Sequence, residues 1–366
     1  MSDRATYADS GVDVRGEHAA LSGLIGWVRK TFAQRPPGTS GHVAVDVGYF
    51  ASVLALTSDL GLAVAADGVG TKLIVAQLAD RFDGVGIDLV AMNVNDLVCV
   101  GAEPITLLDI VSVEGLDARM LEQIGKGLHD GAVQAGITIS GGELAQVGAL
   151  LKGAVPGKAF DLTGVAIGTV PLDAVNLGAD VKPGDVAVGF ASSGIHSNGF
   201  SLARKALLEM AGLSLSDPLP GGSGETVADA LLEPTRIYVK LALEVLRDPA
   251  VEVTALAHIT GGGFQNMVRI QAPCGFLLDA LPPVPAIFTA IQDAGDVALE
   301  DLYSAYNMGV GFTVTVRPGG EQRVLELAEA HGIEAWVIGQ ATDSPERRVT
   351  LPGVGLEHGP GGFRRL

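Results

Sequence analysis

The sequence is poor in cysteine and in basic residues, and it has no long apolar run. Its two cysteines, Cys99 and Cys274, provide no disulfide framework and no metal-binding spacing, which favours a reducing compartment. No apolar stretch has membrane-spanning length. The first residues, Met1-Ser2-Asp3-Arg4, lack the basic and then apolar pattern of a signal peptide. We therefore expect a cytoplasmic protein that does not contact a membrane.

Basic residues are outnumbered, with 24 Lys and Arg against 42 Asp and Glu, for a net charge of −18. This balance argues against nucleic-acid binding, which depends on basic patches that neutralise phosphates. A small phosphorylated ligand would meet repulsion, because two like charges about 4 Å apart interact by roughly 4 kcal/mol at a partly shielded site. A divalent cation between carboxylates and phosphates removes this repulsion. A polyphosphate site in this chain would therefore need Mg²⁺.

Length and composition favour a folded α/β protein. A chain of 366 residues suggests roughly two domains. Hydrophobic residues make up 48% and charged residues 18%, with 50 glycines, which indicates a compact, turn-rich fold and not disorder. The Gly-Lys-Ser/Thr spacing of a P-loop is absent, and no Gly-x-Gly-x-x-Gly follows a predicted strand. Nucleotide binding, if present, must use another arrangement.

Apolar periodicity predicts alternating helices and strands. The expected helices cover 17–33, 84–100, 117–136, 199–211, 236–247, 284–293 and 320–331. The expected strands cover 43–47, 53–58, 61–66, 105–113, 137–140, 161–170, 186–191, 254–258, 309–316 and 334–339. Pro171 and the turn Lys182-Pro183-Gly184-Asp185 mark a domain boundary. We expect an N-terminal domain over 1–171, a C-terminal α/β domain over 172–345, and an edge strand with a tail over 346–366.

The segment Ala66-Asp67-Gly68-Val69-Gly70-Thr71-Lys72 places a carboxylate, flexible glycines and a lysine between a strand and a helix. Asn93-Val94-Asn95-Asp96 follows on a mostly apolar helix, where a carboxylate is costly to bury unless it is paired or binds a metal. We therefore expect Asp67 and Asp96 to hold Mg²⁺ on a polyphosphate. The alternative for Asp67 is an ordinary turn that caps a helix.

Two glycine-containing turns in the second half are further candidates. Ser192-Ser193-Gly194-Ile195-His196-Ser197-Asn198-Gly199 lies between a strand and a helix, where hydroxyls and backbone N–H groups can bind phosphate. His196 could act there as a general acid or base. Ala257-His258-Ile259-Thr260-Gly261-Gly262-Gly263 leads from another strand into a turn, and its glycines allow close approach of a ligand or of another backbone segment. His258 is expected to be a core or wall residue. Glu143, after Gly141-Gly142, is either in a tight turn or a third acid near the metal.

Read together, these motifs resemble one family. Tyr7-Ala8-Asp9-Ser10-Gly11-Val12-Asp13, DGVGTK, MNVNDLVCVGAEP, GGE, SSGIHSNGFSL, LEPTRIYVK, AHITGGGF and YNMGVGF occur in this order over roughly residues 7 to 350. The chain is similar to phosphoribosylformylglycinamidine cyclo-ligase, the aminoimidazole ribonucleotide synthetase of purine biosynthesis. The resemblance implies two-domain α/β subunits in a homodimer, with the N-terminal sheets combining across the dimer.

The resemblance also implies an activity. Formylglycinamidine ribonucleotide, a small phosphorylated substrate, and ATP would give aminoimidazole ribonucleotide, ADP and phosphate, with Mg²⁺ as cofactor. His196 and Lys72 are the catalytic candidates that it implies. ATP and Mg²⁺ would contact Gly48, Asp67, Gly68, Gly70, Thr71, Lys72, Asn93, Asp96 and Glu143, with Asp67 and Asp96 on the metal. The substrate would contact Ser192, Ser193, Gly194, His196, Ser197, Asn198, Thr260, Gly261, Gly262 and Gly263.

Some features depart from the family pattern. The glycine-rich N-terminal loop is reduced to Asp46-Val47-Gly48-Tyr49-Phe50-Ala51, and Leu144-Ala145-Gln146-Val147-Gly148 replaces Thr-Ala-Glu-Met-Pro after Glu143. A catalytically silent nucleotide-binding paralogue is therefore one alternative, and another ATP-dependent enzyme of the superfamily is a second. A selenophosphate synthetase would need a reactive cysteine near its N-terminus, whereas the first cysteine here is Cys99.

Overall fold

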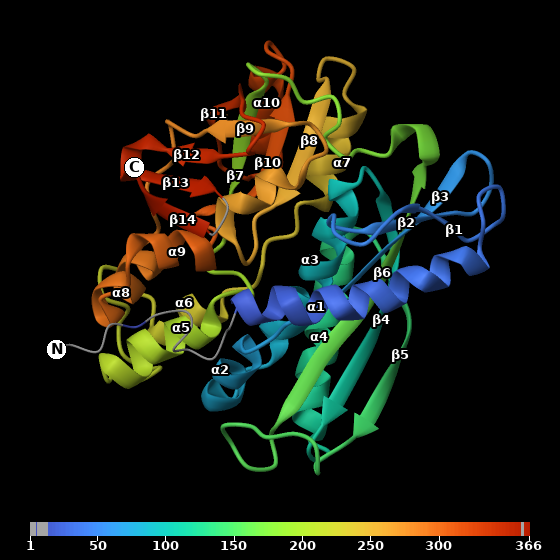
Figure 1. Ribbon diagram of the computed structural model, residues 1–366. Coiled ribbons are helices and arrows are strands. Elements are labelled where there is room, and N and C mark those ends of the chain that lie inside the picture. Colours follow the sequence, from blue (N-terminus) through green and yellow to red (C-terminus); the bar gives the residue numbers. More distant parts are fainter. Residues whose placement is uncertain (1–4, 6–13, 360–361) are drawn as a thin grey trace.

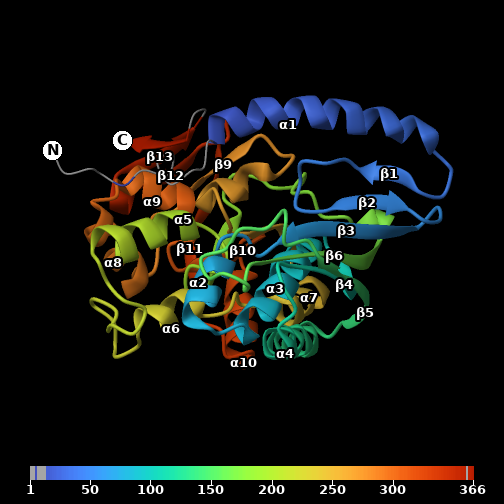
Figure 2. The ribbon, with the colours of Figure 1, turned by 90° about the horizontal axis from the view of Figure 1, so that it is seen from below.

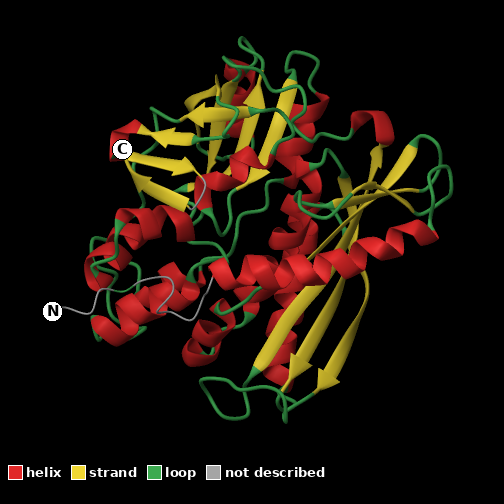
Figure 3. Ribbon diagram, in the orientation of Figure 1, coloured by secondary structure: helices red, strands yellow, loops and turns green. Residues whose placement is uncertain are grey.

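The protein is described here by a computed structural model, which covers residue 5 and residues 14–359 and 362–366. The expected motif Tyr7–Asp13 lies outside the described residues. The chain forms two sheets from its two halves, with helices between and around them (Figures 1 and 3). This mixed α/β architecture confirms the expected fold class.

The first sheet has six strands in the order β1-β2-β3-β6-β4-β5. Only β4 and β5 run parallel, and the other neighbouring pairs are antiparallel. The strands are β1 (His42–Val45), β2 (Ser52–Ala55), β3 (Leu60–Gly68), β4 (Glu103–Val113), β5 (Thr138–Gln146) and β6 (Phe160–Pro171). Their helices are α1 (Val14–Arg29), α2 (Lys72–Ala79), α3 (Asp83–Cys99) and α4 (Ala118–Ala135).

The second sheet has eight strands in the order β14-β13-β12-β9-β11-β7-β10-β8. The strands are β7 (Val186–Ala191), β8 (Val253–His258), β9 (Cys274–Leu277), β10 (Val310–Val316), β11 (Ala335–Asp343), β12 (Val349–Leu351), β13 (Leu356–Gly359) and β14 (Gly362–Arg365). The helices are α5 (Phe200–Arg204), α6 (Val227–Leu232), α7 (Val239–Arg247), α8 (Ala286–Gly295), α9 (Leu299–Ala305) and α10 (Glu321–Ala330).

Helix α3 packs against elements of both halves of the chain. It packs on β3 and β6 of the first sheet and on β8 and α7 of the second half (Figure 1). Most of its residues are buried, including the polar Asp88, Asn93 and Asn95. Buried polar side chains require partners, and in α3 these partners come from both halves of the chain. The candidate site is therefore built around this helix.

Several sequence expectations need correction. Gly141-Gly142-Glu143, considered as a tight turn, continues strand β5, because β5 pairs in parallel with β4 as far as Gln146. The helix expected over 199–211 is α5 followed by a π-helical segment, Lys205–Met210. The short elements α6, α9 and β9 were not expected. Residues 346–366, expected as an edge strand and tail, contribute β12, β13 and β14 to the second sheet.

The first sheet has one covered and one open face. Alternate residues such as Ala63, Leu107 and Ala166 are buried on the side of α3. On the other side Leu108 and Ile110 are 37% and 43% exposed, and their neighbours on β3 and β6 are only half-buried. Helix α1 runs as a long rod along one side of the molecule (Figure 2), and its Leu24 and Trp27 are exposed. Among the described residues, no helix combines the length and apolar character needed to cross a membrane.

Candidate functional site

Two carboxylates from the first half face the second half of the chain. Asp67 lies at the end of β3 and Asp96 lies on α3. The buried Asn93 fixes β3 against α3, since its Oδ1 accepts from Asp67 N at 3.0 Å and its Nδ2 donates to Asp67 O at 3.3 Å. Asn93 thus uses its amide on backbone groups, which differs from the expected contact with phosphate.

The charge on Asp67 is unfavourable in this arrangement. Its side chain reaches solvent, yet the protein atoms around it raise its pKa by desolvation. The hydrogen bond from Gly68 N, 2.7 Å long, opposes the rise, and the nearby charge of Asp96 adds to it. Two carboxylates that repel each other in this way are a donor set suited to a cation.

Asp96 is held by a histidine from the other half. His258 Nδ1 lies 2.9 Å from Asp96 Oδ1, and Asn95 Nδ2 lies 3.4 Å from His258 Nε2. We assign Nδ1–H as the donor to Asp96, because Nε2 then accepts from the Asn95 amide. His258 is fully buried, as expected for a core residue, whereas Asp96 is 19% exposed. One face of the Asp96 carboxylate therefore remains open to a ligand.

Magnesium fits these two residues only together with a phosphorylated ligand. Within the part of the chain that the structure describes, no three His, Cys, Asp or Glu side chains gather as a metal centre. Mg²⁺ commonly binds through one or two carboxylates, with waters and substrate phosphates completing its octahedron. Asp67 and Asp96 match this requirement.

The position of Lys72 disagrees with the role expected for it. Its ammonium group is fully buried and lies 2.8 Å from Asp88 Oδ2. It also donates to His196 O at 3.2 Å and to Glu233 O at 2.7 Å. Desolvation lowers the pKa of Lys72, with the charge and hydrogen bond of Asp88 acting in the opposite direction. Three acceptors occupy its three N–H donors, so none is left for a phosphate of ATP.

The loop 192–199 contacts the segment 66–72, since Lys72 donates to His196 O, but the His196 side chain is buried. Ser193 N donates to His196 Nε2 at 3.2 Å, which places the ring proton on Nδ1. Burial lowers the pKa of His196 far below its usual value, and the positive charges of Lys72 and Arg236 lower it further. An interior, neutral imidazole is poorly placed for the proton transfer expected of it.

Polar atoms without partners concentrate in the loop 192–199. Ser192 Oγ, His196 Nδ1 and Asn198 Nδ2 are buried and lack a hydrogen-bond partner among the described residues. Such groups are costly to leave unpaired. Ser192 and Asn198 are themselves only partly buried, so a small shift would open them to a ligand. Ser193 and Ser197 are already paired, with Pro234 O and the Thr235 hydroxyl.

The turn 260–263 lies against the loop 192–199. A Cβ on Gly261 would lie only 3.2 Å from Asn198 Oδ1, so the turn and the loop approach each other closely at this glycine. Gly263 could carry no side chain, since its Cβ would lie 2.1 Å from Tyr303 O. Thr260 accepts from Asn266 Nδ2 at 3.2 Å. The structure therefore brings the two expected substrate segments together.

Of the remaining residues expected to contact ATP or Mg²⁺, some lie near the two carboxylates and one does not. Gly70, with φ of +71°, and Thr71 are exposed at the start of α2, and Thr71 Oγ1 lies 3.3 Å from Ser201 Oγ. Gly48 is exposed, with φ of +123°, close in sequence to Phe50, whose ring contacts Arg269 at 5.0 Å. Glu143 lies on β5, the edge strand of the first sheet, and pairs with Ile110 of β4. Strands β4 and β6 lie between Glu143 and Gly68, so three strand spacings, about 14 Å in total, separate the two backbones.

Sequence reasoning missed two residues that organise the site. Asp88 is completely buried and accepts from Thr235 N and Oγ1 at 2.7 and 2.6 Å. Asn95, two turns further along α3, accepts from Tyr238 N at 2.9 Å and donates to Arg236 O at 2.9 Å. Polar residues seven apart on an apolar helix share one face. That spacing could have indicated a polar contact with another element.

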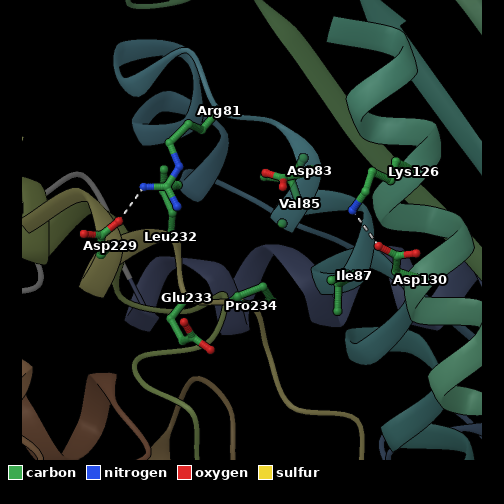
Figure 4. A pocket seen from close by; sticks show the side chains of 11 residues that line it. Arg81, Asp83, Val85, Ile87, Lys126, Asp130, Asp229, Leu232, Glu233 and Pro234 are labelled. Atoms are coloured by element: carbon green, nitrogen blue, oxygen red, sulfur yellow. Dashed lines mark hydrogen bonds and ion pairs between the residues drawn. The ribbon is translucent and has the colours of Figure 1, made fainter. Parts of the chain in front are cut away.

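A separate charged pocket lies at the start of α3. Figure 4 shows Arg81 directed toward Asp229 and Lys126 toward Asp130, at 2.7 and 2.8 Å. The Glu233 side chain also lines this pocket. Because each basic side chain is already paired with an aspartate, we assign no ligand to this pocket.

Comparisons with known proteins identify both halves. The family described as AIR synthase related protein, N-terminal domain, matches residues 48–170, and the corresponding C-terminal domain family matches residues 182–352. The phosphoribosylformylglycinamidine cyclo-ligase of Methanocaldococcus jannaschii is 44% identical over 342 residues, which is 93% of each chain. The enzyme of that name from Thermococcus kodakarensis is 43% identical over 351 residues, 96% of this chain and 99% of that one.

Solved structures share the fold at lower identity. Thiamine-monophosphate kinase from Stenotrophomonas maltophilia is 19% identical with a TM-score of 0.60, covering 88% of this chain and 94% of that one. Escherichia coli HypE, a hydrogenase maturation protein, is 23% identical with a TM-score of 0.56, covering 83% and 84%. The resemblance found in the sequence is thus confirmed, and the chain belongs to the phosphoribosylformylglycinamidine cyclo-ligase family.

Proposed function

We propose that this protein catalyses the ATP-dependent closure of formylglycinamidine ribonucleotide to aminoimidazole ribonucleotide, with release of ADP and phosphate. The observation that carries this proposal is the meeting of Asp67 and Asp96 with the loop 192–199 and the turn 260–263 around α3. Relatives with this activity in their name match nearly the whole chain. The reaction needs one place for a triphosphate and another for a phosphorylated substrate, and this junction offers both.

The reaction needs ATP because the formamide oxygen is a poor leaving group. Transfer of the γ-phosphoryl group of ATP to the formamide oxygen converts that oxygen into a phosphate, which can depart. The amidine nitrogen then attacks the same carbon, and the ring closes as the C–O bond breaks. Holding nitrogen and carbon in contact removes much of the entropic barrier. The protein's main task is therefore to hold two phosphorylated molecules in a fixed relation.

The nucleotide end is assigned to the first half. Asp67 and Asp96 would hold Mg²⁺, which would neutralise charge on the phosphates and on the transferring phosphoryl group. Gly70 and Thr71 offer backbone N–H groups just before α2, whereas the Gly68 N–H already donates to Asp67 Oδ1. We also assign the segment around Gly48 to this end, as the family resemblance implies, and its neighbour Phe50 contacts Arg269 of the second half. Glu143 is not included, since it lies on the distant edge strand.

The substrate end is assigned to the loop 192–199 and the turn 260–263. Ser192 and Asn198 carry polar atoms without a partner, and these are the groups we expect to meet the ribose phosphate or the formamide. Gly261, Gly262 and the Thr260 hydroxyl line the opposite side. His196 is proposed to shape the loop from within, because its ring is covered and neutral.

A homodimer is part of the proposal. The open face of the first sheet carries Leu108 and Ile110, with half-buried apolar residues on the strands beside them. A sheet normally covers its apolar face with another layer. A second copy that places the same face against it would provide this layer. We further propose a cytoplasmic location, where the free thiols of Cys99 and Cys274 would stay reduced.

The decisive experiment measures ADP release by the purified protein with ATP, with and without formylglycinamidine ribonucleotide and Mg²⁺. Release that requires both the substrate and the metal, together with formation of aminoimidazole ribonucleotide, supports the proposal. ATP binding without substrate-dependent turnover would instead indicate a silent nucleotide-binding paralogue.

A further inference from the structure

Lys72 is a buried cation at the junction of three segments. Its ammonium contacts Asp88 of α3, the carbonyl of His196 and the carbonyl of Glu233. The ring of Phe200 lies 5.6 Å from Nζ. Both Lys72 and Asp88 have side chains that are 0% exposed. The motif expected to bind ATP therefore directs its lysine inward, to the junction between the two halves.

Asp88 extends these contacts to the loop 192–199. Its Oδ1 accepts from Thr235 N and from Thr235 Oγ1. The Thr235 hydroxyl in turn lies 3.0 Å from Ser197 Oγ. A continuous chain of polar contacts thus runs from Lys72 through Asp88 and Thr235 to Ser197. A second branch runs directly from Lys72 to His196.

The direct contact from Lys72 is made to a residue, His196, whose backbone conformation is unusual. His196 has φ of +62°, in the left-handed region that non-glycine residues seldom occupy. Such a conformation persists only where surrounding contacts fix it. Lys72 binds the carbonyl of this residue, and the Ser193 N–H binds its ring. The direction of the next residues, Ser197 and Asn198, depends on this turn.

We infer that the buried Lys72–Asp88 pair is a positioning device that fixes the loop 192–199, and that Lys72 is not a ligand of the nucleotide phosphates. This inference rests on the proposed function, because it assigns the loop to the substrate. It goes further by naming the contacts that connect the ATP-binding half to the substrate loop. Removing the pair loosens the loop and weakens substrate binding, and leaves the carboxylates at the metal unchanged.

The test compares the wild type with the double variant Lys72→Met, Asp88→Asn. The double change avoids a buried unpaired carboxylate, and the new amide oxygen still accepts from Thr235 N. Lys126→Met, Asp130→Asn serves as the matched control, since that exposed pair lies within helix α4. The readouts are hydrogen exchange without ligands, the affinity for Mg-ATP alone, and the KM for formylglycinamidine ribonucleotide.

We expect backbone amides in peptides covering 192–203 to exchange at least about tenfold faster in the double variant, with strand β10 unchanged. Mg-ATP affinity should stay within about threefold, and the KM for the second substrate should rise about tenfold or more. Unchanged exchange in 192–203 overturns the inference. A selective loss of Mg-ATP affinity also overturns it, because Lys72 would then be a phosphate ligand.

A milder variant decides the matter if the double variant does not fold. Thr235→Val keeps the shape and the backbone N–H but removes the hydroxyl between Asp88 and Ser197. Faster exchange confined to 192–203 with normal Mg-ATP affinity supports the inference, and wild-type exchange refutes it. The exchange measurement requires no turnover. If the wild type shows no substrate-dependent ADP release, the proposed function is refuted. The exchange result for the loop 192–199 can still be interpreted.

Discussion

Asp96 on helix α3 accepts a hydrogen bond from His258 Nδ1, at the end of strand β8, over 2.9 Å. The two residues belong to different halves of the chain, so this contact fixes one candidate metal carboxylate relative to the turn 260–263. A carboxylate held by a histidine in this way has less freedom to rotate away from a metal. This contact would connect the proposed metal site to the proposed substrate side of the site.

Replacing His258 by Ala should weaken Mg²⁺ binding in the presence of ATP by about 10-fold to 100-fold, the range found when groups behind metal ligands are removed. Calorimetric titration with Mg²⁺ measures this directly. His331→Ala is the control, because His331 also pairs with an acid, Glu244, but away from the site. Equal metal affinity in both variants would show that His258 does not position Asp96.

Replacing Asp67 by Asn should abolish most Mg²⁺-dependent turnover while leaving the fold as stable as before or more stable. Its pKa is raised, so its charge is unfavourable in the folded state, and neutralising it removes this cost. Turnover at limiting Mg²⁺ and the melting temperature are the two measurements. Asp173→Asn, at an exposed aspartate away from the site, should change neither. A strong loss of stability in Asp67→Asn would contradict the electrostatic reading.

His196 should make stability depend on pH. Its folded pKa is depressed by burial, whereas in the unfolded chain it titrates near its ordinary value of about 6.5. Below that pH the unfolded chain binds a proton that the folded chain does not, so stability falls as the pH decreases, by up to about 1.4 kcal/mol per unit. Urea unfolding of the wild type and His196→Asn at pH 5 and 7.5 tests this prediction. Asparagine suits the left-handed backbone. An equal pH effect in both proteins would show that His196 titrates in the folded protein as it does in the unfolded chain.

Lysine substitution of both Leu108 and Ile110 should convert a dimer into a monomer, because charges would be buried between the two open sheet faces. Light scattering after size-exclusion chromatography gives the mass of each species. Leu150→Lys is a suitable control, since Leu150 is 82% exposed and outside the sheets. A monomeric wild type would remove the homodimer from the proposal.

The local parts of the site could be predicted from the sequence. Asp67 and Gly68 end a strand and Asp96 lies on a long apolar helix, and both features follow from short-range periodicity and from the cost of burying a carboxylate. The glycine turn at 260–263 was also visible, because three glycines in a row favour close approach of another group. Each of these inferences uses neighbours within a few turns of chain.

The partners of these residues could not be predicted. His258 is 162 positions from Asp96, and the carbonyls that bind Lys72 lie 124 and 161 positions away. The same Asp-Gly-Val-Gly-Thr-Lys run could direct its lysine outward to a phosphate or inward to Asp88. Nothing in the local pattern distinguishes the two, because the choice depends on whether another element supplies acceptors.

The amino-acid sequence alone determined the two-domain α/β class, the family, and the acidic residues that would need a cation beside a phosphorylated ligand. These follow from composition, periodicity and ordered motifs, which are properties of the chain itself. Only the tertiary structure decided that Lys72 is an interior ion-pair residue, that His196 is covered and neutral, and that Glu143 lies on a distant edge strand. Burial and pairing depend on which distant segments pack together, and packing around α3 sets them in this protein.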